Sequence, residues 1–387
     1  MRRFGLGLAL MIAVVLVPGV VRAQSIDDLN LQVHGYVVQA FVKSNQNSWN
    51  TTDSENGSAS WNEAVVNLSL QPQAKLKIGV QGRFQLLGDS GGDGNFTVDW
   101  AQLDYTANSY FGFRVGDVKT PMGLLNETQD IDPAHLWVLL PQSVYPIASR
   151  NSILDHFGGV VYGAVALGER GGKLQYRGFG GERVMGPNDG YFQGFRDEGV
   201  TLPNGMTGLI LGGTLKWEAP VRGLMVGASL SSLDSSGEIV EGPYQGTNTV
   251  PRFESPYYFG KYERGRWMVA GEYNRLPALA LTAFAGAPVA YNRLDQRAFY
   301  AMASYKATEK LTGGVYYSSS IDKQSVFTSA RYQKDWAVAA RYDFNSFLYA
   351  KAEQHFIDGT EIGFAKSDNP NLQPTTRMTM LKLGVSF

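Results

Sequence analysis

The chain has 387 residues, a formal net charge of −1 at pH 7 and no cysteine. The lack of cysteine excludes disulfides and thiolate metal sites, and the balanced charge gives no support for nucleic-acid binding. Glycine (45 residues), tyrosine (20) and phenylalanine (20) are numerous, and no linker, charge block or low-complexity tract divides the chain. These features favour one large β domain.

The first 23 residues have the pattern of a secretory signal peptide. Two arginines precede an apolar stretch at residues 4–17, and Val-Arg-Ala at 21–23 suits signal peptidase. The stretch is shorter than the roughly 20 residues of a spanning helix, so a retained anchor is the weaker interpretation. We expect the mature chain to begin at Gln24, to form one domain over 24–387 and to carry a net charge of about −4, since three arginines are removed.

Strand-like alternation follows the signal sequence. From Lys75 to Leu86, polar residues of one parity alternate with apolar residues of the other, which predicts a strand with one wet and one apolar face. The same pattern recurs at 29–42, 209–218 and 336–344. After residue 23 no apolar run approaches the roughly 20 residues of a membrane helix, so any membrane crossing would use strands.

The predicted connections alternate in length. Short turns are expected at 72–73, 107–108, 168–172, 219–223, 264–265, 308–309 and 345–346, and long polar loops at 43–60, 182–206, 234–255, 277–295, 321–333 and 358–374. This asymmetry is typical of transmembrane antiparallel β-barrels in the outer membrane. If 325–333 ends a loop, the count is sixteen strands, with eighteen as the alternative.

The segment 119–156 is the longest connection in the first half of the chain. It contains an apolar run at 136–140 bounded by Pro133 and Pro141, and the acids Glu127, Asp130 and Asp132. A connection this long is usually functional or disordered, and its apolar run favours order. We expect it to fold inward, pack Tyr145 against the run and constrict a pore. The alternatives for the run are a short plug helix or a trimer contact.

The last strand, at 375–387, places Leu381, Leu383, Val385 and Phe387 on one face. The terminal Phe387 resembles the signature by which outer-membrane barrels are recognised by the barrel-assembly machinery. Together with the export signal, this ending predicts localisation in the outer membrane.

Residues 110–132, above all RVGDVKTPMG at 114–123, resemble the strand-to-third-loop junction of the phosphate-selective porin family and its wider porin relatives. The sequence LLPQSVYP at 139–146 resembles the continuation of that loop. The resemblance implies a sixteen-stranded barrel, a homotrimer and a third loop folded into the lumen. The family's anion specificity depends on a dense ladder of basic lumenal side chains, for which a mature charge of about −4 gives no overall support.

Strand parity predicts which charges would face a pore. The inward basic candidates are Lys75, Lys77, Arg83, Arg114, Lys173, Arg177, Lys216, Arg341 and Lys351. We predict that the pore and its constriction are lined by Lys77, Arg83, Arg114, Lys119, Glu127, Asp130, Asp132, Arg177, Arg341 and Lys351, with Arg83, Arg114 and Glu127 at the narrowest point. A basic wall facing an acidic loop would bias ion flow. The alternative for each residue is a solvated position away from the constriction.

No catalytic or cofactor motif stands out. The four histidines lack metal-ligand spacing, and Gly-x-Ser-x-Gly is absent. The sequence predicts a porin in outer-membrane lipid, without enzymatic activity, metal or cofactor. Small hydrophilic solutes or ions would diffuse through its channel. The alternatives are a barrel enzyme using Ser152, Asp155 and His156, and a structural or adhesive barrel.

Overall fold

The computed structural model describes residues 30–50, 52–88, 96–326 and 328–387, so the predicted signal peptide lies outside the described residues. The strands are β1 (Gln32–Ser44), β2 (Ser58–Gln73), β3 (Leu76–Leu87), β4 (Phe96–Thr106), β5 (Gly112–Lys119), β6 (Asp155–Ala166), β7 (Lys173–Met185), β8 (Val200–Thr201), β9 (Met206–Glu218), β10 (Leu224–Glu241), β11 (Tyr244–Arg264), β12 (Trp267–Phe284), β13 (Ala290–Lys306), β14 (Leu311–Asp322), β15 (Tyr332–Asp343), β16 (Leu348–Gly359) and β17 (Thr375–Ser386). The short helices are η2 (Asp132–Ala134), η3 (Ile147–Ser149), α2 (Arg150–Leu154), η4 (Gly190–Phe192), α3 (Gln193–Asp197) and η5 (Ser329–Arg331).

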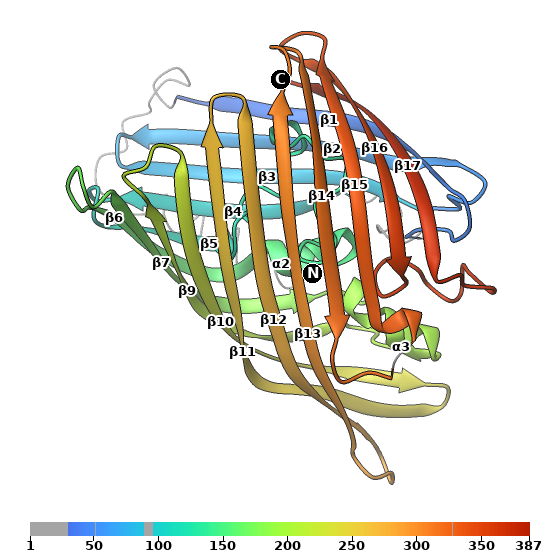
Figure 1. Ribbon diagram of the computed structural model, residues 1–387. Coiled ribbons are helices and arrows are strands. Elements are labelled where there is room, and N and C mark those ends of the chain that lie inside the picture. Colours follow the sequence, from blue (N-terminus) through green and yellow to red (C-terminus); the bar gives the residue numbers. More distant parts are fainter. Residues whose placement is uncertain (1–29, 51, 89–95, 327) are drawn as a thin grey trace.

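The strands form a closed antiparallel ring (Figure 1). Each long strand pairs with its neighbours along the chain, and β1 pairs with β17 to close the barrel. At the closure, Gly35 and Phe387 exchange two backbone hydrogen bonds of 3.0 Å. The two-residue β8 pairs only with β10, so sixteen strands make the ring. This confirms the predicted count of sixteen over the alternative of eighteen.

Alternating burial separates the two faces of the strands. On β17, Leu381 and Leu383 are 51% and 52% exposed, whereas Met378 and Met380 are at most 1% exposed. The exposed apolar residues form the outer face of the barrel, the face that lipid covers in an outer-membrane protein. Trp267 and Tyr305 pack on this face beside a short turn, with ring centroids 4.6 Å apart, as in an interfacial aromatic girdle.

Two predicted loops are wrong. Residues 234–255 and 277–295 are mostly strand, since β10 and β11 are joined by a two-residue turn, and β12 extends to Phe284 before β13 begins at Ala290. These hairpins carry Pro251, Pro256 and Pro277, which normally argue against a strand. The register between β11 and β12 shifts between Thr249 and Tyr257, where the chain accommodates two of the prolines.

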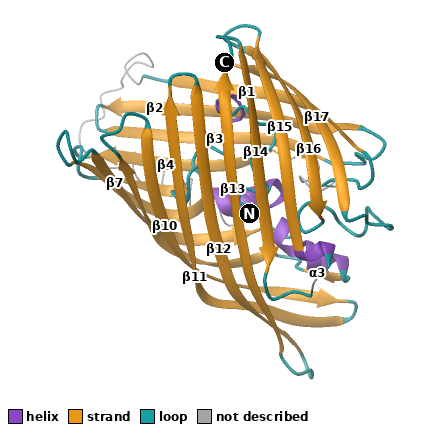
Figure 2. Cartoon of the chain, in the orientation of Figure 1, coloured by secondary structure: helices purple, strands orange, loops and turns teal. Residues whose placement is uncertain are grey.

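The remaining long connections contain the helices (Figure 2). We call residues 120–154, between β5 and β6, loop 3, and residues 186–205, between β7 and β9, loop 4. Loop 3 contains η2, η3 and α2, and loop 4 contains η4, α3 and β8. Within the described ranges, no helix is long and apolar enough to cross a membrane.

Loop 3 contributes to both main apolar clusters of the protein. Trp137 packs with Tyr145 and residues of β12–β15 in one cluster, whereas Val138 and Leu139 pack with residues of β1, β16 and β17 in the other. The apolar run at 136–140 is therefore shared between two parts of the barrel wall, and Tyr145 joins its first cluster as predicted.

Candidate functional site: charged residues around loop 3

A glycine turn starts loop 3. Gly123 has φ +65°, and a Cβ at this position would lie 2.1 Å from Glu272 Oε1, so only glycine fits without displacement. Its N–H donates to Ser229 Oγ over 3.0 Å. Asn126 Nδ2 donates to the carbonyls of Thr120 and Ile153 at 2.8 and 2.9 Å, which ties the two ends of the loop together.

Asp132 is the centre of a buried ion-pair cluster. Its carboxylate accepts hydrogen bonds from Lys382 Nζ at 2.8 Å, Lys351 Nζ at 2.9 Å and the Tyr349 hydroxyl at 2.8 Å. The side chains of Asp132, Lys351 and Lys382 are 10%, 0% and 2% exposed. Burial opposes ionisation of Asp132, but the two ammonium groups hold its pKa well below its usual range. We call these four residues the anchor cluster.

A second buried carboxylate holds the apolar run. Glu353 on β16 accepts the backbone N–H groups of Val138 and Leu139 at 2.8 and 3.2 Å. His355 lies between two carboxylates, with Nε2 2.7 Å from Glu353 and Nδ1 2.8 Å from Asp335. Charged groups of β15–β17 therefore bind loop 3 on one side.

Three predicted pore residues also lie in buried pairs. Arg83 donates to Glu63 over 2.9 Å, and its side chain is 4% exposed. Lys119 lies 2.7 Å from Asp130, whose side chain is 0% exposed. Arg150, which the sequence did not single out, pairs with Asp99 on β4 at 2.7 Å. The Lys119–Asp130 and Arg150–Asp99 pairs hold loop 3 against β4 and β5. Arg83 on β3 adds a hydrogen bond from Nη1 to Asn151 Oδ1 of loop 3 over 3.1 Å.

Glu127 forms a more accessible cluster. Arg114 Nη1 lies 3.2 Å from Glu127 Oε1, Arg177 donates to Oε2, and Lys216 Nζ is 4.0 Å from Oε2. Arg114 also donates to Asp104 over 2.9 Å. The side chains of these residues are 15% to 22% exposed. We call these five residues the Glu127 cluster.

The last two predicted residues lie elsewhere. Arg341 donates to the carbonyls of Pro133 and His135 at 2.5 and 3.0 Å, so it also binds loop 3. Lys77 is exposed near the short turn between β2 and β3. The structure thus divides nine of the ten predicted residues into buried pairs, loop contacts and one accessible cluster, and leaves Lys77 apart from them. Their lining of an open pore stays a prediction.

Several partners were missed from the sequence. They are Glu63, Asp99, Asp104, Glu353 and Lys382, all of which contact the predicted residues or loop 3. Strand alternation could have placed Lys382 on the same face as Met378 and Met380. No sequence signal pairs it with Asp132, 250 residues away.

The serine and histidine of the enzyme alternative do not meet. His156 Nδ1 is 2.8 Å from Thr120 Oγ1, and the Ser152 hydroxyl donates to the Ser149 carbonyl over 2.9 Å. A nucleophile requires its base within hydrogen-bond reach. In the described part of the chain, no group of three His, Asp or Glu side chains is arranged to hold a metal ion.

Comparison with known proteins places this architecture in context. A family model described as Gram-negative porin matches residues 9–387. No curated protein matches the chain in sequence.

Solved structures share the fold at low sequence identity. OmpF of Salmonella typhi, in complex with daunomycin, has a TM-score of 0.55 and 15% identity, covering 93% of this chain and 98% of that one. The anion-selective porin of Comamonas acidovorans has a TM-score of 0.53 and 10% identity, covering 92% and 99%. The trimer form of in-vitro folded OmpT of Vibrio cholerae has a TM-score of 0.50 and 14% identity, covering 92% and 99%.

Proposed function

Because this chain belongs to the Gram-negative porin family, we propose that it is a non-enzymatic outer-membrane channel through which small hydrophilic solutes and ions diffuse passively. A barrel of sixteen strands is wide enough to enclose water. The separate hydrogen bonds of Ser152 and His156 support a channel without a hydrolytic site.

We infer that loop 3 lies in the lumen and narrows it. The support is that loop 3 contacts well-separated strands of the ring: Gly123 binds Ser229 on β10, whereas Asp132 binds Lys382 on β17. Both partners are on the side of their strands opposite the exposed apolar face. A segment that bonds to separated parts of a closed wall from this side spans the enclosed space.

The Glu127 cluster is the proposed selectivity element, and its partial exposure is the observation that carries this assignment. It contains three basic side chains and two carboxylates, so its formal charge is positive by one. Charges in a narrow passage are poorly screened and act on passing ions. We expect a weak preference for anions.

The deciding measurement is the reversal potential of the purified protein in a planar bilayer under a salt gradient. An anion-favouring potential is expected. A cation-favouring potential would contradict the role of the Glu127 cluster, and the absence of conductance would favour the structural or adhesive alternative.

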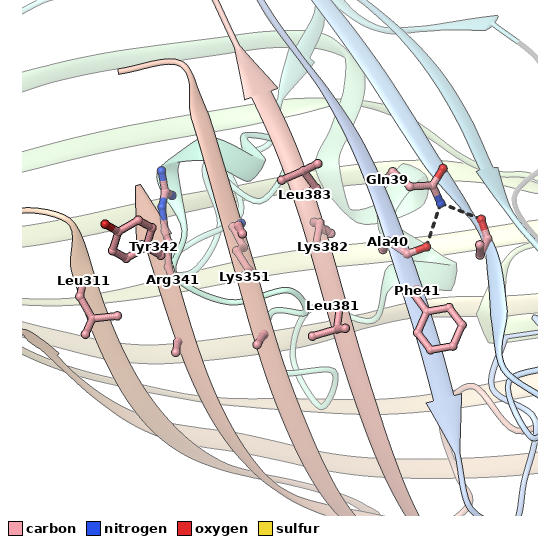
Figure 3. Close-up of a pocket in the computed structure, with 14 residues that line it drawn as sticks. Gln39, Ala40, Phe41, Leu311, Arg341, Tyr342, Lys351, Leu381, Lys382 and Leu383 are labelled. Atoms are coloured by element: carbon pink, nitrogen blue, oxygen red, sulfur yellow. Dashed lines mark hydrogen bonds between the residues drawn. The ribbon is translucent and has the colours of Figure 1, made fainter. Parts of the chain in front are cut away.

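We also propose that the protein is a homotrimer in outer-membrane lipid and that Phe387 is read by the barrel-assembly machinery. An apolar depression of about 510 Å³ on the outer face supports a subunit contact (Figure 3). Phe41, Leu381 and Leu383 line it together with the small residues Ala340 and Ala352. If another subunit fills this depression, the bulky charged side chain of Ala352→Arg should block the contact and lower the mass of the detergent-solubilised complex. An unchanged mass would place the subunit contact elsewhere.

A further inference from the structure

A second cavity lies under loop 4. It has a volume of about 350 Å³ and lies between loop 4 and the ends of β9–β13. Tyr191 and Phe195 of loop 4 line one side, and Phe253, Leu276 and Leu294 line the strand side. The volume lies within the range of small-molecule sites, and α3, which carries Phe195, lies at the barrel end from which the long hairpins extend (Figure 1).

The strand residues of this cavity share the face that holds the selectivity cluster. On β12 the lining residues Leu276, Ala278 and Ala280 have the same parity as the buried Glu272. Leu233 on β10 likewise has the parity of Ser229. The wall of a water-filled barrel is usually polar, and apolar side chains left open to water are unfavourable. This apolar lining is therefore suited to an apolar part of a ligand.

One cation is held at the cavity. Arg183 on β7 lines it, its Nε donates to the Ser152 carbonyl over 2.5 Å, and its guanidinium carbon lies 5.9 Å from the centre of the Tyr191 ring. Among the residues that the structure describes, Arg183 forms no ion pair, so its charge is not neutralised by a neighbouring carboxylate.

The two carboxylates at the cavity differ from each other. Asp234 is engaged by Arg252 at 2.9 Å and by the N–H of Leu209 at 2.9 Å. Glu198 lies at the exposed end of loop 4. A positioned guanidinium beside aromatic walls binds a planar carboxylate well.

We propose that this cavity binds a small aromatic carboxylate, with its ring against Phe195, Phe253 and Leu276 and its carboxylate at Arg183. The site would concentrate such solutes at one end of the channel before they reach the Glu127 cluster. Binding itself does not depend on conduction; only the role in permeation rests on the proposed function.

Saturation-transfer NMR on the detergent-solubilised full chain tests the site, with benzoate as the probe and acetate, cyclohexanecarboxylate and benzyl alcohol as comparisons. Because so small a ligand binds weakly, the titration should extend to about 20 mM. We expect saturable binding of benzoate, weaker binding of cyclohexanecarboxylate and none of acetate.

Two variants separate the ring from the charge. Arg183→Gln should weaken benzoate about tenfold, the loss of one charge-assisted contact, and leave benzyl alcohol unchanged. Ala278→Phe fills the cavity and should abolish binding of both. The matched controls are Arg293→Gln, an exposed arginine on β13, and Leu279→Phe, the next residue on β12 with the opposite parity. Neither control should change binding.

Non-saturating signals, or equal binding by wild type and Ala278→Phe, would overturn the proposal, since partition into detergent would then explain them. Loss of folding in Ala278→Phe, seen by circular dichroism, leaves Arg183→Gln against Arg293→Gln as the deciding pair. Benzoate binding without salt conductance would overturn the proposed channel function but support the proposed binding site. Salt conductance without benzoate binding would support the channel function but overturn the binding site.

Discussion

The anchor cluster and the Glu127 cluster both pair a loop 3 carboxylate with basic side chains of the strands, but they differ in accessibility. Around Asp132 the two lysine side chains are at most 2% exposed, and around Glu127 the basic side chains are 15% to 22% exposed. A buried pair resists separation because a lone charge would remain without water. A partly exposed pair can exchange its partner for water or a passing ion. Within loop 3, Asp132 can thus attach the loop to the barrel wall, whereas the proposed role of Glu127 is to interact with passing ions.

Removal of the anchor should have the largest effect. Asp132→Ala leaves Lys351 and Lys382 buried without a counter-ion and should destabilise the folded protein by about 3–5 kcal/mol. Denaturant unfolding in micelles measures this loss. The matched control is Glu309→Gln, which breaks an exposed pair with Lys306 and should leave the unfolding midpoint unchanged. Equal midpoints for Asp132→Ala and wild type would mean that the anchor cluster does not hold loop 3.

Glu127→Gln should change selectivity far more than stability. It removes the negative charge shared by Arg114, Arg177 and Lys216, so the anion preference should rise roughly two- to fivefold. The salt-gradient reversal potential measures it. Asp358→Asn removes the same charge from an exposed pair with Lys334 and serves as the control. If both variants shift the potential equally, net charge rather than the position of Glu127 sets selectivity.

Arg177→Gln should shift the potential in the opposite direction by a smaller amount. Arg114 remains bound to Glu127, so part of the carboxylate charge stays compensated. Increased cation permeability, measured in the same bilayer assay, is the expected result. An unchanged potential would show that Arg177 lies away from the ion path.

The smallest expected effect concerns pH. Burial lowers the pKa of His135 in loop 3, near Asp130, Asp132 and Lys351, so the folded state takes up this proton less readily than the unfolded chain. Stability should therefore fall as the pH drops below the ordinary histidine pKa of about 6.5, because only the unfolded state gains the proton.

His135→Gln should reduce this dependence, measured as the difference in denaturant midpoint between pH 7.5 and pH 5.5. Glutamine retains a donor for the Thr128 carbonyl, which His135 Nε2 contacts at 2.7 Å. An unchanged pH dependence would assign the effect to other titratable groups.

By itself, the sequence determined the strand alternation, the sixteen strands and the place of the last strand at the end of the chain. A strand with one lipid-facing side must alternate, so each segment such as Leu76–Leu87 carries its own local signal. The hairpins of β10–β13 lack that signal along part of their length and contain prolines, so the sequence pattern wrongly predicts loops at their ends.

Only the tertiary structure decided which charges are buried and which remain accessible. Parity places Arg83, Arg114 and Lys351 on one face, but it does not show that Arg83 and Lys351 are buried in ion pairs while Arg114 stays partly exposed. The physical reason is that strand alternation depends on neighbouring residues, whereas burial and ion pairing depend on partners brought together by closure of the barrel. Asp132 and Lys382 meet across 250 residues only because β17 completes the ring.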